Sequence, residues 1–200
     1  MSEQELNLSF DSQKFFQLYG RKCSPAEIGC TLSHYAIYKK IKDLSIPYAL
    51  ILEDDIKVVN EKFQEAIEQS TKILDQETKP TIILLSGAYT YTQSQQLTND
   101  IKLVNVYGAI LAHSYIINLP AAQLLIQQFP CIQADDWEYI SQCGIRVKAI
   151  LPHLIEQNRK QFNISNIWEE SHKYKKRTLR NLFKSTINAF LSIIGHKEQG

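Results

Sequence analysis

The chain of 200 residues lacks several features that would point at once to a class of function. It has 22 Lys and Arg against 21 Asp and Glu, so its net charge of +1 gives no overall attraction to nucleic acid. None of its four cysteines forms a C-x-x-C pair, which argues against a zinc ribbon or a thioredoxin-type site. No apolar run is long enough to span a bilayer, and no internal repeat is present.

The opening segment also lacks the basic and then apolar pattern of a secretory signal, because MSEQELNLSF is polar and acidic. We therefore expect a cytoplasmic protein whose cysteines stay reduced. Hydrophobic residues make up 44% of the chain and charged residues 22%, which is typical of a globular protein. The length fits one domain followed by a tail.

Hydrophobic spacing predicts an α/β fold. SPAE at 24–27 has the residues of a capping box with proline at the first helical position, so a helix should run from there to about residue 44. The run 48–52 is continuously apolar, which is typical of a strand buried on both faces of a parallel sheet. A helix over 60–74 and an apolar strand over 81–87 complete a βαβ unit. Farther along, the pattern predicts a polar loop (88–100), strands (101–108, 109–119 and 145–152) and helices (121–129 and 134–144).

The last part of the chain has a different character. From residue 168 on, basic residues alternate with apolar ones at helical spacing, with six Lys and Arg between 173 and 184. We predict a domain over 1–167 and a tail over 168–200, in which an amphipathic helix over 173–194 contacts an anionic membrane surface. The alternative is a helix that packs on the domain and keeps its lysines in water.

Three consecutive carboxylates, Glu53, Asp54 and Asp55, follow the apolar run 48–52. Residues two apart on a strand face the same way, so Glu53 and Asp55 should converge on one point. Such a pair of hard oxygen ligands suits Mg²⁺ or Mn²⁺, which in turn binds phosphate oxygens. The alternative is a solvated strand end followed by a turn.

These residues carry a resemblance to a known family. SPAEIGCTLSHYAIYKKI followed by PYALILEDDI resembles the signature of glycosyltransferase family 25, whose members include bacterial lipooligosaccharide galactosyltransferases and collagen galactosyltransferases. Ala26 stands where the family pattern has its first glycine. GAILAHSYIINLPAAQLLI and ADDWEYISQCGIRVKAILPHLIEQ resemble later blocks of the family, in the same order.

The resemblance implies a GT-A-like fold with a mixed, mostly parallel sheet flanked by helices, and a nucleotide-sugar donor such as UDP-galactose. The acceptor would be lipooligosaccharide or lipopolysaccharide, at the inner face of a bacterial inner membrane. Glu53 and Asp55 would hold Mn²⁺ or Mg²⁺ and the donor phosphates, His153 would complete the metal site, and Asp54 would lie near the ribose or the sugar.

The resemblance also assigns candidate roles on the acceptor side. Asp135 and Asp136 are the candidates for the base, with helix capping as the alternative. The candidate substrate-binding residues, several of which have a structural alternative as core or surface side chains, are Ser33, His34, Trp137, Glu156 and Gln157.

Two further expectations concern the start of the chain and the rival functions. The residues before Ser24 show no strand of the kind with which family members open, so we expect the first strand of the family to be missing. A truncated, inactive family member that acts as a membrane-peripheral binding protein is therefore an alternative. A hydrolase of phosphate esters is another, and it would need no acceptor.

Overall fold

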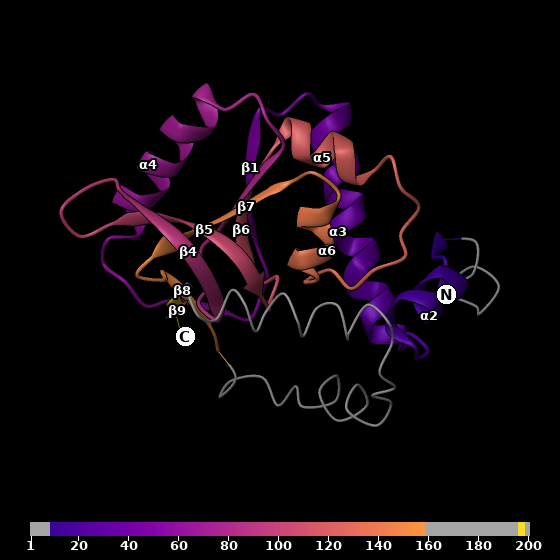
Figure 1. Cartoon of the computed structure of the whole chain (residues 1–200). Coiled ribbons are helices and arrows are strands. Elements are labelled where there is room, and N and C mark those ends of the chain that lie inside the picture. The colour runs from indigo at the N-terminus through magenta and orange to yellow at the C-terminus, as the bar shows by residue number, and fades with distance from the viewer. Residues whose placement is uncertain (1–8, 159–195, 199–200) are drawn as a thin grey trace.

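A sheet with helices on both sides forms the body of the molecule. The computed structural model describes residues 9–158 and 196–198. Figure 1 shows α4 (Phe63–Gln76) on one side of the sheet, and α3 (Pro25–Asp43), α5 (Leu119–Leu125) and α6 (Trp137–Gln142) on the other. The remaining elements are α2 (Ser12–Tyr19), β1 (Tyr48–Leu52), β2 (Ile56–Val58), β3 (Thr81–Leu84), β4 (Tyr89–Gln96), β5 (Lys102–Ala109), β6 (Ser114–Asn118), β7 (Arg146–Leu151), β8 (Ile155–Gln157) and β9 (His196–Glu198).

The sheet is mixed but mostly antiparallel. Its strand order is β1-β6-β3-β7-β5-β4-β9, and β2 pairs separately with β8. Among the described strands of this sheet, β3 and β7 form the one parallel pair. The α/β class is confirmed, whereas the expectation of a mostly parallel sheet is wrong, because β6 lies between β1 and β3 and is antiparallel to both. The likeness to a GT-A fold stays a prediction.

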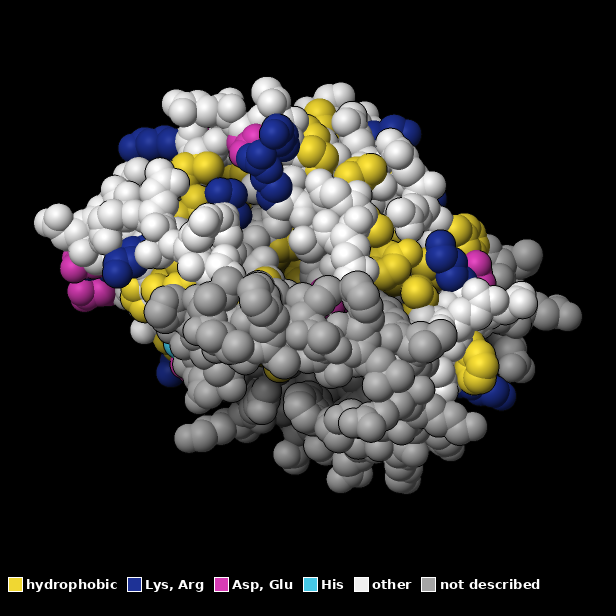
Figure 2. All heavy atoms as spheres, viewed as in Figure 1, with side chains coloured by type: hydrophobic (Ala, Val, Ile, Leu, Met, Phe, Trp, Pro, Cys, Tyr) yellow, Lys and Arg dark blue, Asp and Glu magenta, His cyan; other side chains and the backbone are white. Residues whose placement is uncertain are grey.

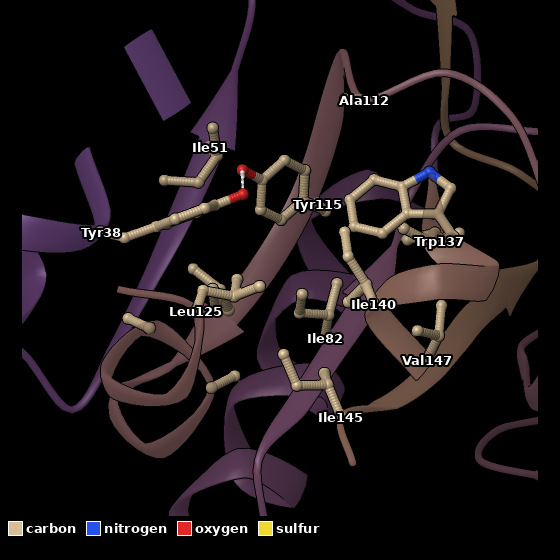
Figure 3. Packing of buried hydrophobic residues seen from close by; sticks show 14 of the residues in the cluster. Tyr38, Ile51, Ile82, Ala112, Tyr115, Leu125, Trp137, Ile140, Ile145 and Val147 are labelled. Carbon is tan, nitrogen blue, oxygen red and sulfur yellow. Dashed lines mark hydrogen bonds between the residues drawn. The ribbon is translucent and has the colours of Figure 1, made fainter. Parts of the chain in front are cut away.

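Alternation along the central strands builds two hydrophobic cores, one on each face. Ile82 and Leu84 of β3 point into the core beneath α3, α5 and α6, while Ile83 and Leu85 point into the core beneath α4. The first core contains Tyr38, Tyr115 and Trp137, which Figure 3 shows side by side. Because both faces are covered, β3 and β6 are buried along their whole length. The continuously apolar sequence of β3 therefore reflects burial of both its faces and does not depend on whether its neighbours are parallel or antiparallel.

Helix α3 begins as its sequence predicts. Ser24 accepts a hydrogen bond from the Glu27 N–H, and the Glu27 carboxylate accepts one from the Ser24 N–H, so the capping box is complete. Pro25 occupies the first turn, where its missing N–H costs nothing. The helix packs against α5 and buries, among others, His34, Tyr38 and Ile41.

Two strand predictions are corrected. β1 is an edge strand, with Leu50 and Leu52 exposed at 39% and 44%, rather than a strand buried on both faces. The segment 88–100, predicted as a polar loop, contains β4, which pairs with β5. Only the first residue of β4, Tyr89, is buried, so the strand carries no hydrophobic alternation that would reveal it.

The predicted domain boundary at 167/168 and the helix over 173–194 lie outside the described residues. Among the helices that are described, none combines the length and the apolar character needed to cross a bilayer.

Candidate functional site

The acidic triplet lies where the chain leaves the sheet. β1 ends at Leu52, and residues 53–55 form a turn that leads into β2. The Glu53 N–H donates to the His113 carbonyl at 2.9 Å, which fixes the turn against the segment before β6. Because the backbone turns here, strand alternation no longer dictates that Glu53 and Asp55 face the same point. Asp54 is exposed.

Glu53 faces helix α3 and contacts His34. The His34 Nε2 lies 3.4 Å from the Glu53 Oε1, and the His34 Nδ1 lies 2.6 Å from the Tyr115 hydroxyl. The Tyr115 hydroxyl is 2.8 Å from that of Tyr38. His34 is buried, whereas the Glu53 side chain is one-third exposed. A chain of polar groups therefore runs from the core of the domain to the surface at Glu53.

Cys30 lies one helical turn before His34 and completes this group. The Cys30 Sγ, a ring nitrogen of His34 and a carboxylate oxygen of Glu53 all lie within 4.8 Å of one another. Burial raises the pKa of Cys30 to about 12, and the charges of Glu53 and Asp135 contribute to this rise. Both carboxylates are therefore close enough to act on the thiol.

Asp135 joins the group from the other side, through the segment that precedes β6. Its Oδ2 accepts a hydrogen bond of 3.2 Å from the Leu111 N–H, and the Trp137 Nε1–H donates to the Leu111 carbonyl at 3.0 Å. Burial raises the pKa of Asp135, the neighbouring charge of Asp136 adds to this, and the Leu111 N–H partly offsets it. Asp135 is thus a carboxylate whose pKa is raised and whose charge acts on Cys30.

Asp136 has a structural role. Its Oδ1 accepts the Tyr139 N–H at 3.0 Å as the N-cap of α6, and its Oδ2 accepts from the Tyr19 hydroxyl. The capping alternative therefore describes Asp136 and not Asp135.

Asp55 belongs to a different arrangement. It is 6% exposed, its Oδ2 accepts from Gln157 at 2.6 Å, and its carbonyl accepts from the Asn158 N–H at 2.6 Å. These bonds fasten β2 to β8. Within the described part of the chain, the Asp55 Oδ1 is buried without a hydrogen-bond partner. His153 contacts Glu156 at 3.3 Å, with the Glu156 side chain half exposed.

The predicted metal ligands are therefore divided among three different partners. Glu53 contacts His34, Asp55 contacts Gln157, and His153 contacts Glu156. Cys30, His34 and Glu53 are the one group of three possible metal ligands found at close range in the residues that the structure describes. A thiol and an imidazole beside a single carboxylate do not fit Mg²⁺ or Mn²⁺, which favour oxygen ligands.

Two predicted substrate-binding residues make contacts within the domain itself. Trp137 is 1% exposed and packs edge-on against Tyr115, with the ring centroids 5.3 Å apart, so it is a core residue and not a surface for stacking a sugar. Ser33 is exposed, and its hydroxyl donates to the Gly29 carbonyl of its own helix at 2.9 Å.

The residues that sequence reasoning did not assign to the site are Cys30, Tyr115 and the backbone of Leu111. Cys30 could have been predicted from the sequence, because Cys-x-x-x-His spacing places both side chains on one face of a helix. Tyr115 and Leu111 could not have been predicted, since a mostly apolar sequence does not show which hydroxyl or backbone group will bond to a distant segment.

Comparison with known proteins agrees with the motifs. Residues 2–139 match the family described as Glycosyltransferase family 25 (LPS biosynthesis protein). The chain is 26% identical over 113 residues to human procollagen galactosyltransferase 2, covering 55% of this chain and 18% of that protein. It is 27% identical over 119 residues to procollagen galactosyltransferase 1 of Danio rerio, covering 56% and 19%. The match thus spans about a fifth of these relatives. Because the family match covers well over half of the sequence and contains His34, Glu53 and Asp135, the chain belongs to glycosyltransferase family 25.

Proposed function

We propose that this chain transfers a hexose, galactose by preference, from a UDP-sugar to a saccharide acceptor of the lipooligosaccharide or lipopolysaccharide class. Family membership supports transfer of a sugar, and the relatives named as galactosyltransferases support galactose. The observation that carries the proposal is a pair of acids inside the matched region whose charges both act on Cys30: Glu53, which is partly exposed and contacts His34, and Asp135, whose pKa is raised by burial.

In the proposed reaction Asp135 is the base. The acceptor hydroxyl oxygen forms a bond to the anomeric carbon of the donor as the bond from that carbon to the diphosphate oxygen breaks. The electron pair of the broken bond leaves with UDP, and the hydroxyl proton passes to Asp135. A carboxylate whose pKa is raised by burial is a better proton acceptor near neutral pH than a fully solvated one.

The groups around Asp135 hold it in place. The Leu111 N–H binds one of its oxygens, and Leu111 is itself fixed through its carbonyl by the indole of Trp137. Trp137 is buried against Tyr115, which also binds His34. Trp137 therefore serves the site as a positioning residue. Glu53, partly exposed beside them, is free on its solvent side to bind substrate hydroxyls.

A divalent cation on the donor diphosphate is the other expectation for this family. No step above depends on it, because Glu53, Asp55 and His153 are not joined into one site. UDP binding measured with and without Mn²⁺ tests this expectation by itself.

The proposal includes peripheral contact with the inner face of a bacterial inner membrane. Lys and Arg side chains are scattered over the described face in Figure 2, so this part of the proposal rests on the basic sequence 173–194 alone. Binding of the full chain to vesicles with and without anionic lipid tests it.

Turnover of UDP-sugars by the full chain tests the enzymatic proposal. We expect UDP release from UDP-galactose that depends on a saccharide acceptor. Asp135→Asn should lower kcat by about 10²–10⁴-fold, the usual contribution of a general base. Asp136→Asn is the matched control, because asparagine caps a helix as well as aspartate does and should leave turnover nearly unchanged.

Three results would count against the proposal. Acceptor-independent UDP-sugar hydrolysis would favour a hydrolase. Absence of both UDP-sugar binding and turnover would favour a binding protein without catalysis. Equal losses in Asp135→Asn and Asp136→Asn would remove Asp135 from the role of base.

A further inference from the structure

Cys30, His34 and Glu53 bring a thiol, an imidazole and a carboxylate to one point at the edge of the sheet. Their ligand atoms lie within 4.8 Å of one another. We propose that this group is a site for one Zn²⁺ ion, with three protein ligands and a fourth position open to water or to a substrate oxygen. The proposal does not rest on the transferase activity, and its test measures metal binding.

Local structure holds each of the three ligands. Cys30 and His34 are four residues apart on α3, so they lie one turn apart on the same face of a rigid helix. Glu53 stands at the end of β1, where its N–H is fixed to the His113 carbonyl. The ligands thus come from a helix and a strand end that pack together, which suits a site whose geometry exists before the ion binds.

The partner of His34 is the kind that metal-binding histidines use. With the metal on Nε2, the proton sits on Nδ1, which lies 2.6 Å from the Tyr115 hydroxyl and can donate to it. Tyr115 in turn is 2.8 Å from the Tyr38 hydroxyl and can donate onward. A hydrogen bond to the second ring nitrogen fixes the tautomer and the orientation of a ligating histidine.

The ligand types select the ion. Zn²⁺ takes sulfur, nitrogen and oxygen ligands in tetrahedral geometry, whereas Mg²⁺ takes oxygen ligands in an octahedral arrangement. Three protein ligands with an open fourth position are typical of zinc ions that act on a bound molecule. Cys30 is half-buried and the Glu53 side chain is one-third exposed, so an ion and a small ligand can approach from that side.

The competing explanation is a buried histidine that merely bonds to Tyr115 and Glu53, with Cys30 as a packing residue. This explanation predicts no specific metal binding. It also predicts that replacing Cys30 has the same effect on metal binding as replacing any other half-buried cysteine. Cys143 provides the matched control, because it is also half-buried but follows α6 and accepts a hydrogen bond from Gln128.

Metal titration of the EDTA-treated full chain tests the proposal. Co²⁺ reports thiolate coordination by its absorption, and competition with Zn²⁺ gives the affinity. We expect one Co²⁺ per chain with a thiolate band, displaced by Zn²⁺ and not by Mg²⁺. Cys30→Ser should remove the band, whereas Cys143→Ser should keep it. Tyr115→Phe should weaken Zn²⁺ binding by about 10–100-fold, as the loss of a ligand's orienting partner does.

Two results would overturn the site. Co²⁺ bound without a thiolate band, or with a band that survives Cys30→Ser, would place the ion elsewhere in the chain. The second is failure to bind one Zn²⁺ per chain in protein whose folding is verified by circular dichroism. His34 would then be a core residue that bonds to Tyr115 and Glu53 without a metal.

Discussion

Adjacent carboxyls at positions 135 and 136 show how far one residue's surroundings set its chemistry. Both carboxylate oxygens of Asp136 accept hydrogen bonds from protein donors at the start of α6. Asp135 instead accepts from the Leu111 N–H, and its charge acts on the Cys30 thiol. Burial raises the pKa of Asp135. The raised pKa makes Asp135 the one of the two acids suited to take a proton.

The pH dependence of turnover follows from this shift. A base works only when ionised, so kcat/KM should fall as the pH drops through the raised pKa of Asp135. The acidic limb should therefore lie at higher pH than that of an ordinary aspartate. A pH profile of kcat/KM with saturating acceptor measures this. An acidic limb at the pH of a fully solvated carboxyl would contradict the role of Asp135.

Glu27 is a second motif residue whose role is structural. It is 7% exposed, pairs with Arg21, and accepts from the Ser24 N–H and the Gln133 amide at 2.9 Å each. We expect Glu27→Gln to lower the free energy of unfolding by about 3–5 kcal/mol, because it leaves a largely buried Arg21 without its counter-charge. Urea denaturation measures the change. Glu65→Gln, at an exposed pair with Lys62, should cost less than about 1 kcal/mol.

The same variant has a pH signature with a definite sign. Burial acts to raise the pKa of Glu27, but its bonds to Arg21 and Ser24 outweigh burial, and the net pKa is lowered. A lowered pKa contributes stability above the unfolded pKa that is lost as the pH falls through the folded pKa. The deficit of Glu27→Gln should shrink in acid. A deficit that stays constant from neutral pH into acid would show that lost packing, and not charge, sets the cost.

At the scale of elements, local signals predicted the helices and failed on strand arrangement. The capping box at Ser24 and Glu27 lies within four residues, so α3 was readable from the sequence. The placement of β6 between β1 and β3 depends on contacts between residues 31 or more apart, such as Leu52 with Ser114 and Ile82 with Ile117, and no local pattern encodes it. Continuous apolarity predicted burial on both faces, which holds for β3 but not for the edge strand β1, and it did not indicate the direction of the neighbouring strands.

The β2–β8 pair offers a prediction at this scale. Asp55 is buried in the turn just before β2, and Gln157 at the end of β8 is the side chain that donates to it. Gln157→Ala should lower the free energy of unfolding by about 1–3 kcal/mol, because a buried acceptor loses its donor. Urea denaturation measures this, and amide hydrogen exchange should show faster opening of β2 and β8.

Glu156→Ala is the control for that variant, since it alters the neighbouring residue of the same strand. The Glu156 side chain is half exposed and contacts His153, so we expect a loss below about 1 kcal/mol. Equal losses in the two variants would show that the strand pair does not depend on the bond between Asp55 and Gln157.

At the scale of the whole molecule, the site is assembled from segments that are far apart in the chain. Cys30 and His34 come from α3, Glu53 from the end of β1, and Asp135 from the approach to α6. Sequence reasoning found three of these four through their resemblance to a family. It paired Glu53 with Asp55, because alternation along an extended strand places residues two apart on one side, whereas the turn at 53–55 directs Glu53 toward α3.

Zinc binding at this junction should stabilise the whole fold, because the ion would join a helix to a strand end. A ligand that binds only the folded state at 100 times its Kd adds about 2.7 kcal/mol, which for a chain of this size raises Tm by roughly 5–10 °C. Thermal unfolding of the EDTA-treated chain with and without Zn²⁺ measures the shift. Mg²⁺ should give no shift, and Cys30→Ser should remove that of Zn²⁺ while Cys143→Ser retains it. If Zn²⁺ raises the Tm of Cys30→Ser as much as that of the unaltered chain, the ion stabilises the fold from some other place, and the junction of α3 with β1 is held by packing alone.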